Sequence, residues 1–118
     1  MSEIKIRKPL QNDVDEIANV LLDFYNIEDH QEAKKVITDE QKKDFHYLLA
    51  VEDDKVLGLV TWITHGLPKH GLFELDRICI MTNARGRGIG KKLVTALIDD
   101  AQNWFKKRNG EARKLYLL

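Results

Sequence analysis

A chain of 118 residues is long enough for one modest hydrophobic core and too short for two, so we expect a single domain over residues 1–118. With 43% hydrophobic and 32% charged residues, the composition is that of a soluble globular protein and excludes a disordered or fibrous one. Nineteen Lys and Arg balance nineteen Asp and Glu, so no net field would draw the protein onto nucleic acid or an anionic membrane.

Targeting and metal signals are absent from the sequence. No apolar run approaches the roughly 20 residues that span a bilayer, and the first residues lack the apolar core of a signal peptide, so we expect a cytoplasmic protein. Cys79 is the only cysteine, which excludes an internal disulfide and a cysteine-based zinc site. His65 and His70 flank a loop without carboxylates at ligand spacing, so we expect no metal.

The first 43 residues predict one short strand and two helices. Ile4 and Ile6 alternate with charged residues before Pro9, as in a strand. Asn12 or Asp13 can cap a helix, in which apolar residues recur at helical spacing: Val14, Ile17, Ala18, Leu21 and Tyr25. A second helix is expected over residues 29–43, where the thin apolar stripe predicts loose packing on the surface.

Residues 44–118 predict most of the sheet and one long helix. Alternation over 45–51, a turn at Asp53 and Asp54, and an apolar, β-branched run over 56–64 predict a hairpin. We expect a third strand over 72–80, an amphipathic helix from 89 to about 108, and a last strand over 114–118. The order β-α-α-β-β-β-α-β is a mixed α/β fold.

The segment between that third strand and the long helix combines three glycines with four cations, which are Arg85, Arg87, Lys91 and Lys92. Glycines let successive N–H groups form a concave nest, and the first N–H groups of a helix lack partners. Cations at a helix N-terminus are disfavoured by up to about 1 kcal/mol each, so this cluster predicts a polyanionic ligand such as a pyrophosphate. The alternative is a tight turn surrounded by solvated cations.

Spacing separates the nucleotide motifs that compete for this loop. A dinucleotide-binding G-x-G-x-x-G would need glycine at position 91, which is lysine. A Walker loop would need glycine at position 85 and serine or threonine at 92, which are arginine and lysine. The pattern that matches is [QR]-x-x-G-x-[GA], which runs from Arg85 to Gly90.

In this loop and in the order of its elements, the whole chain resembles the GCN5-related N-acetyltransferase superfamily. The resemblance implies an acyl-CoA N-acyltransferase-like fold with acetyl-CoA as co-substrate. It further implies that the pantetheine arm is bound by the main chain of Ile78, Cys79 and Ile80. The pyrophosphate would be bound by the nest formed by Arg85, Gly86, Arg87, Gly88, Ile89, Gly90 and Lys91.

The resemblance also implies a general base. Many members carry a glutamate eleven residues before the [QR] position, and Glu74 stands eleven residues before Arg85. We therefore expect Glu74 to deprotonate the acceptor amine directly or through a water, with Asp76 as the second candidate. The alternative is that both carboxylates are solvated or pair with Lys69 and Arg77.

The strand period of two places Glu74 on the same face as Asp76, Ile78 and Ile80, and Cys79 on the opposite face. We therefore expect Cys79 to be a buried thiol and not a nucleophile. The family's geometry implies that the N–H of Ile80 stabilises the oxyanion. The acid that protonates the thiolate stays unassigned.

These features predict an N-acetyltransferase that transfers an acetyl group from acetyl-CoA to a primary amine of a small molecule or peptide. The alternative is a coenzyme A binding module or incomplete domain without turnover. The acceptor is not identified, because the variable loops over residues 25–32 and 65–71 show no decisive charge bias. Since the family normally continues beyond Leu118, we expect a C-terminally truncated domain. Its last strand would then have an unpaired edge and favour a homodimer.

Overall fold

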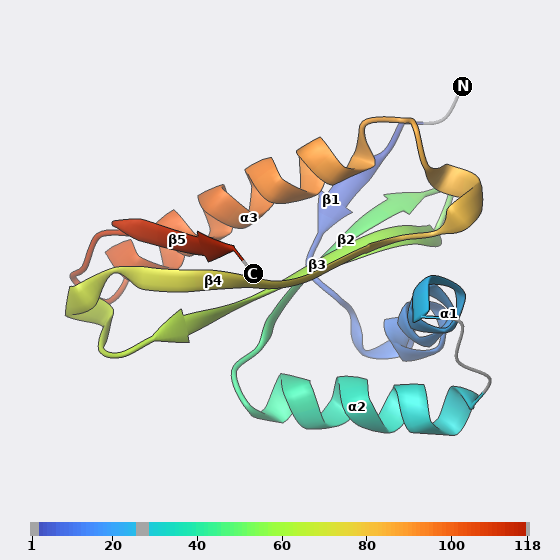
Figure 1. The fold of residues 1–118 in the computed structure, drawn as a ribbon, viewed down its shortest axis with the longest axis horizontal. Helices are drawn as coiled ribbons and strands as arrows, with labels where there is room; N and C mark the ends of the chain where they lie inside the picture. The colour runs from blue at the N-terminus through green and yellow to red at the C-terminus, as the bar shows by residue number, and fades with distance from the viewer. Residues whose placement is uncertain (1–2, 26–28, 118) are drawn as a thin grey trace.

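The computed structural model of the chain describes residues 3–25 and 29–117. Its centre is a sheet with the strand order β1-β2-β3-β4-β5, antiparallel except for the parallel pair β4 and β5. The strands are β1 (Lys5–Arg7), β2 (His46–Glu52), β3 (Lys55–His65), β4 (Leu72–Ile80) and β5 (Lys114–Leu117). One face carries the first two helices and the other face carries the third (Figure 1); these are α1 (Val14–Tyr25), α2 (His30–Lys42) and α3 (Ile89–Lys106). The predicted element order and mixed α/β fold are confirmed.

Local hydrogen bonds hold the turn that precedes α1 and the start of α2. Asp13 ends a 3₁₀ turn (Gln11–Asp13) and accepts the N–H of Leu10 at 2.6 Å. The guanidinium of Arg7 also binds this carboxylate at 2.7 Å, which holds the pKa of Asp13 below its usual value. Asp29 precedes α2 and accepts the N–H of Glu32 at 3.1 Å, as an N-cap residue does.

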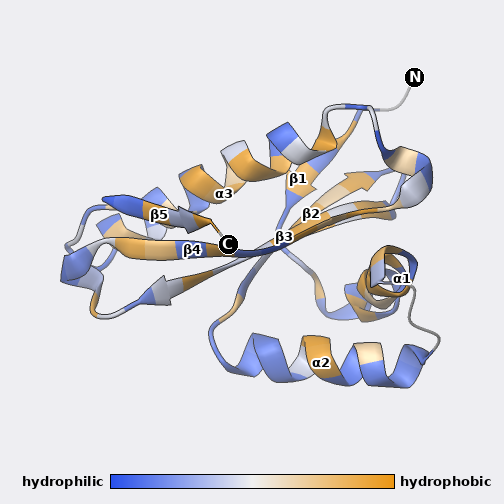
Figure 2. Ribbon diagram, in the orientation of Figure 1, coloured by the Kyte–Doolittle hydropathy of each residue, from blue (hydrophilic) through white to orange (hydrophobic). Residues whose placement is uncertain are grey.

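The sheet separates two hydrophobic cores, and Figure 2 shows the apolar sides of the helices turned toward it. The core beneath α1 and α2 includes Ile17, Leu21, Ile37, Leu49, Leu59 and Cys79. The core beneath α3 includes Val60, Trp62, Phe73, Leu93, Leu97 and Phe105. Burial of each large side chain contributes roughly 1.5–3 kcal/mol, so both helical layers are held mainly by packing on one shared sheet.

Strand β4 contains a bulge where it pairs with β3. Trp62 lies opposite Leu75 and Thr61 lies opposite Arg77, so Asp76 is the extra residue on β4. One extra residue reverses which side chains face each side of the sheet. Phe73 and Leu75 before the bulge, and Ile78 and Ile80 after it, consequently all pack on the α3 side.

The prediction that Glu74 shares a face with Ile78 and Ile80 is therefore wrong. Glu74 alternates with residues that face α3, so it faces the side of α1 and α2, where Cys79 is buried. The prediction that Cys79 faces away from Glu74 is wrong for the same reason. Asp76 does share the face of Glu74, because its carboxylate accepts the hydroxyl of Thr61 at 3.1 Å.

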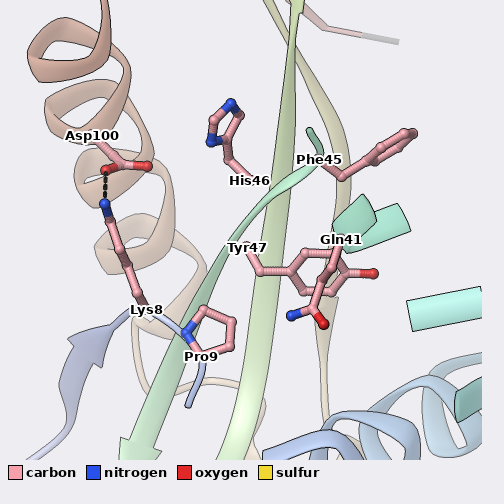
Figure 3. A pocket seen from close by; sticks show the side chains of 7 residues that line it. All are labelled: Lys8, Pro9, Gln41, Phe45, His46, Tyr47 and Asp100. Carbon is pink, nitrogen blue, oxygen red and sulfur yellow. Dashed lines mark ion pairs between the residues drawn. The ribbon is translucent and has the colours of Figure 1, made fainter. Parts of the chain in front are cut away.

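A polar hollow of about 260 Å³ lies at the start of β2, where its lining includes Asp100 of α3 and Gln41 of α2 (Figure 3). In it, His46 stacks on Trp62 with ring centroids 4.0 Å apart, and its buried Nε2 has no hydrogen-bond partner among the described residues. Asp100 accepts the indole N–H of Trp62 at 3.0 Å and pairs with Lys8 at 3.6 Å. The lining comprises Lys8, Pro9, Gln41, Phe45, His46, Tyr47 and Asp100.

Burial of His46 predicts a loss of stability in mild acid. Burial lowers the pKa of His46 below its ordinary value of 6.5, so below about pH 6.5 the unfolded chain binds more protons than the folded protein. The free energy of unfolding should then fall as the pH drops from 7 toward 5, with a slope from this residue of at most about 1.4 kcal/mol per pH unit. Urea unfolding of the wild type and His46→Phe measures it, because phenylalanine keeps the stacking and cannot titrate. Equal slopes in the two proteins would contradict the prediction.

No helix among the described residues is long and apolar enough to cross a membrane.

At the edge of the sheet, β5 pairs with β4 over Leu72 to Leu75, and Leu117 is 68% exposed. The homodimer expected at this edge stays a prediction.

Candidate active site

The glycine-rich loop lies where β4 passes into α3. A 3₁₀ turn (Thr82–Ala84) precedes it, and Gly88 is the N-cap residue of α3. Gly86 and Gly88 have φ angles of 81° and 76°, values that L side chains rarely adopt. Apart from its chain neighbours, a Cβ atom at either position would have no atom of the described residues within 4 Å. The loop therefore has space above its backbone, at the positive end of an 18-residue helix.

Gly90 differs from the other two glycines. It lies inside α3 with an ordinary helical backbone, and a Cβ there would touch the Cδ1 of Ile80 at 3.4 Å. The first turn of α3 thus packs on β4 at a distance that would also accommodate a methyl group. Ile89 is buried in the core, so only its main chain can face a ligand.

Asp23 connects the loop to α1. Its carboxylate accepts the N–H of Thr82 at 2.7 Å and the hydroxyl of Thr82 at 3.0 Å. This contact joins residues 59 positions apart in the sequence. It holds the 3₁₀ turn before the glycines against α1.

The four cations around the loop are not equivalent. The guanidinium of Arg87 binds Glu52 through two hydrogen bonds of 2.6 and 3.1 Å, which lowers the pKa of that carboxyl. Glu52 at the end of β2 is thus paired with the glycine loop. Arg85 lies over the ring of Phe24, 5.9 Å from its centroid, while Lys91 and Lys92 are exposed on the first turn of α3. Among the contacts of the described side chains, the charges of Lys91 and Lys92 are therefore the most accessible to a ligand.

The second half of β4 is paired on one side only within the described chain, because β5 covers β4 no further than Leu75. The main chain of Ile78, Cys79 and Ile80 lies in this half, directly before the glycine loop. Burial raises the pKa of the Cys79 thiol to about 11, so the thiolate a nucleophile needs is disfavoured. The expectation of an inert thiol agrees with this environment.

The two predicted carboxylates have different partners. Glu74 contacts the Nε2 of His65 at 2.9 Å, whereas Asp76 accepts the hydroxyl of Thr61 at 3.1 Å. Neither pairs with Arg77 or Lys69 in the described contacts, so the alternative based on those two cations is wrong. Both carboxylates stay on the side of the sheet that carries α1 and α2.

Arg77 instead joins β4 to α2. Its guanidinium binds both carboxylate oxygens of Glu40 at 2.9 Å, and the hydroxyl of Tyr47 donates to the same carboxylate. Burial disfavours the charged form of Arg77, but its hydrogen bonds to Glu40 keep its pKa above the ordinary value. Burial also raises the pKa of Tyr47. The prediction that α2 lies loosely on the surface is therefore wrong, because Glu40 attaches it to the sheet.

Breaking this pair should be costly. The side chains of Arg77 and Glu40 are only 17% and 15% exposed, so Glu40→Ala would leave a shielded guanidinium without its counterion. We expect the free energy of unfolding to fall by about 3–5 kcal/mol. The matched control is Lys34→Ala, which breaks the exposed pair with Asp15 and should cost less than about 1 kcal/mol. Similar losses in urea unfolding of the two variants would contradict the assignment.

Beside this ion pair, a hollow of about 350 Å³ opens between α1, α2 and β4. We call it the α1–α2 hollow; its lining is Leu21, Tyr25, Glu32, Ala33, Val36 and Arg77. Tyr25 and Val36 are 48% and 39% exposed, so apolar surface faces solvent there. Residues 26–28 of the predicted acceptor loop (residues 25–32) lie outside the described residues.

Four side chains that shape this region were not predicted from the sequence: Asp23, Glu40, Glu52 and His65. Their partners lie 59, 37, 35 and 9 positions away, so no local pattern announces the contacts. The available signal was the hairpin register, which brings His65 diagonally next to Glu74. Among residues 3–25 and 29–117, no group of three or more His, Cys, Asp and Glu side chains could hold a metal ion.

A glycine nest at a helix N-terminus, beside a bulged strand with an open edge, is an arrangement that can bind an extended phosphate-bearing ligand. The model of the acetyltransferase (GNAT) family matches residues 14–117. This chain belongs to that family.

Solved structures of acetyltransferases share this fold. A ribosomal-protein-alanine N-acetyltransferase from Brucella melitensis biovar Abortus 2308 is 26% identical and has a TM-score of 0.74; the match covers 98% of this chain and 79% of that one. A GNAT family acetyltransferase from Brucella melitensis in complex with acetyl-CoA is 21% identical, with a TM-score of 0.74 and coverage of 98% and 75%. An aminoglycoside N-acetyltransferase in complex with CoA is 17% identical, with a TM-score of 0.75 and coverage of 100% and 78%. No curated protein matches the sequence significantly.

Proposed function

We propose that the chain transfers an acetyl group from acetyl-CoA to a primary amine by direct attack of the amine on the thioester. The observation that carries the proposal is the glycine loop, in which Gly86 and Gly88 leave open space above unpaired N–H groups at the start of α3. The pyrophosphate would bind there, near Lys91. The pantetheine arm would lie along the open edge of β4 from Ile78 to Ile80.

The acceptor would enter from the α1–α2 hollow, which borders Arg77 on the same half of β4. Both carboxylate oxygens of Glu40 bind the guanidinium of Arg77 and neutralise its charge. The remaining charged side chain in the lining is Glu32. One carboxylate beside Leu21, Tyr25 and Val36 suits an amine carried on an apolar or aromatic body. A polycationic acceptor such as an aminoglycoside would need more acidic groups than this lining offers.

Glu74 is the proposed general base, acting directly or through a water. The amine nitrogen would bond to the thioester carbon, and the C–S bond would break as the tetrahedral intermediate collapses. The N–H of Ile80 is the proposed donor to the oxyanion.

Two measurements test the proposal. Calorimetric titration should show binding of acetyl-CoA and coenzyme A, and much weaker binding of ATP, which lacks the pantetheine arm. An acetylation assay should then show turnover of an arylalkylamine in preference to a polyamine, an aminoglycoside or an alanyl peptide. Coenzyme binding without turnover of any of these amines would favour the binding module over the enzyme, and absence of coenzyme binding would refute both.

A further inference from the structure

A pair of side chains joins the end of β3 to the start of β4. His65 is the last residue of β3 and lies opposite Leu72, while Glu74 lies opposite Ile63, so the two are diagonal neighbours on one face. The Nε2 atom of His65 lies 2.9 Å from the Oε1 atom of Glu74. The ring of Tyr116 on β5 meets the imidazole edge-on, with centroids 5.9 Å apart.

The two members of the pair differ in their access to water. The side chain of Glu74 is 13% exposed and that of His65 is 43% exposed. The ends of β3 and β4 near the short 3₁₀ turn η2 (Pro68–His70) extend past α1 and α2 (Figure 1). The imidazole is thus the member of the pair that solvent reaches most readily.

The reaction proposed above releases a proton that must leave the site. An ammonium acceptor loses two protons as it becomes an amide, and the coenzyme thiolate takes up one of them when the C–S bond breaks. One proton per turnover therefore remains, and the base that received it must be discharged before the next cycle. The carboxylate of Glu74 is largely shielded, so we expect this proton to leave through a neighbouring group that solvent reaches more readily.

We propose that His65 is the proton outlet of Glu74, an inference that rests on the proposed function. The proton passes from Oε1 of Glu74 to Nε2 of His65, and the imidazolium releases a proton to water or buffer. The direction toward solvent follows from the exposures of the two side chains, which are 13% for Glu74 and 43% for His65. His65 lies opposite Leu72, two residues farther from the open half of β4 than Glu74. It therefore acts through the carboxylate and does not reach the acetyl group itself.

The test is His65→Gln in buffers of low concentration. A glutamine amide can still donate a hydrogen bond to Glu74, but it cannot carry a proton. We expect kcat to fall roughly tenfold, the KM for acetyl-CoA to stay unchanged, and added imidazole to restore kcat in the variant without accelerating the wild type. His70→Gln is the matched control, because the ring of His70 accepts the N–H of Leu67 at 3.0 Å within its own loop. This control should retain wild-type kcat.

Three results would overturn the proposal. If His65→Gln keeps wild-type kcat at every buffer concentration, His65 carries no proton. The same conclusion follows if kcat falls and imidazole does not restore it. In both cases an active wild type leaves the proposed function standing. A wild type that acetylates no amine removes the proposed function and this inference with it. Circular dichroism and the melting temperature of His65→Gln show whether a loss of kcat reflects unfolding.

Discussion

Gly88→Val is expected to reduce coenzyme A affinity by at least about a hundredfold, roughly 3 kcal/mol of binding free energy. Gly88 has a φ of 76°, which a β-branched residue tolerates poorly, and it is the N-cap residue of α3. A Cβ atom at this position meets no atom of residues 3–25 and 29–117 within 4 Å apart from its chain neighbours, so a valine side chain would project into the space proposed for the pyrophosphate. The folded core should be affected little. Isothermal titration with coenzyme A measures the loss.

The control for this substitution is Gly90→Ala. Residue 90 has a helical backbone, and the added methyl group would make ordinary contact with Ile80 at 3.4 Å. Coenzyme affinity should therefore stay within a few-fold of wild type, and the helix should gain slightly from alanine. A correctly folded Gly88→Val protein that binds coenzyme A as tightly as Gly90→Ala would rule out the glycine nest as the coenzyme site.

The features predicted well from the sequence have local causes. The third strand was expected over residues 72–80 and is found there, since its apolar run is bounded by Gly71 and the glycine loop. The long helix begins at Ile89 as predicted, because its buried residues recur every three to four positions. Phosphate binding at the glycine loop stays a prediction, but the flexibility that it assigns to Gly86 and Gly88 is found. Their positive φ angles are the backbone conformation that the nest requires.

The features that were missed depend on register and on long-range contacts. The bulge at Asp76 has no signature in residue type, yet it reverses the face of every later residue of β4. Simple alternation therefore placed Cys79 on the wrong side of the sheet. The pair of Arg77 with Glu40 joins a strand to a helix 37 positions away. Only the packing of α2 on the sheet brings those two side chains together.

The bulge also explains how one strand can serve two ligands. Before it, Glu74 faces the side of α1 and α2 while β5 pairs along the strand. After it, Ile78 and Ile80 turn toward α3, and their main chain lies on the edge that β5 does not reach. The proposed acceptor in the α1–α2 hollow would therefore approach a face of β4 and the proposed coenzyme its open edge, without competing for the same groups.

Glu74→Gln is expected to lower kcat by tenfold or more and to leave the KM for acetyl-CoA nearly unchanged, because a base acts in the chemical step and does not contact the coenzyme. Glutamine has nearly the same shape, and its carbonyl can still accept a hydrogen bond from His65, so the fold should persist. Steady-state kinetics with an arylalkylamine over a range of pH measures the loss. The matched control is Asp76→Asn, whose amide oxygen can still accept the hydroxyl of Thr61 and whose kcat should fall much less. If Asp76→Asn loses activity and Glu74→Gln keeps wild-type kcat at every pH, the base is Asp76, and the contact between His65 and Glu74 is structural.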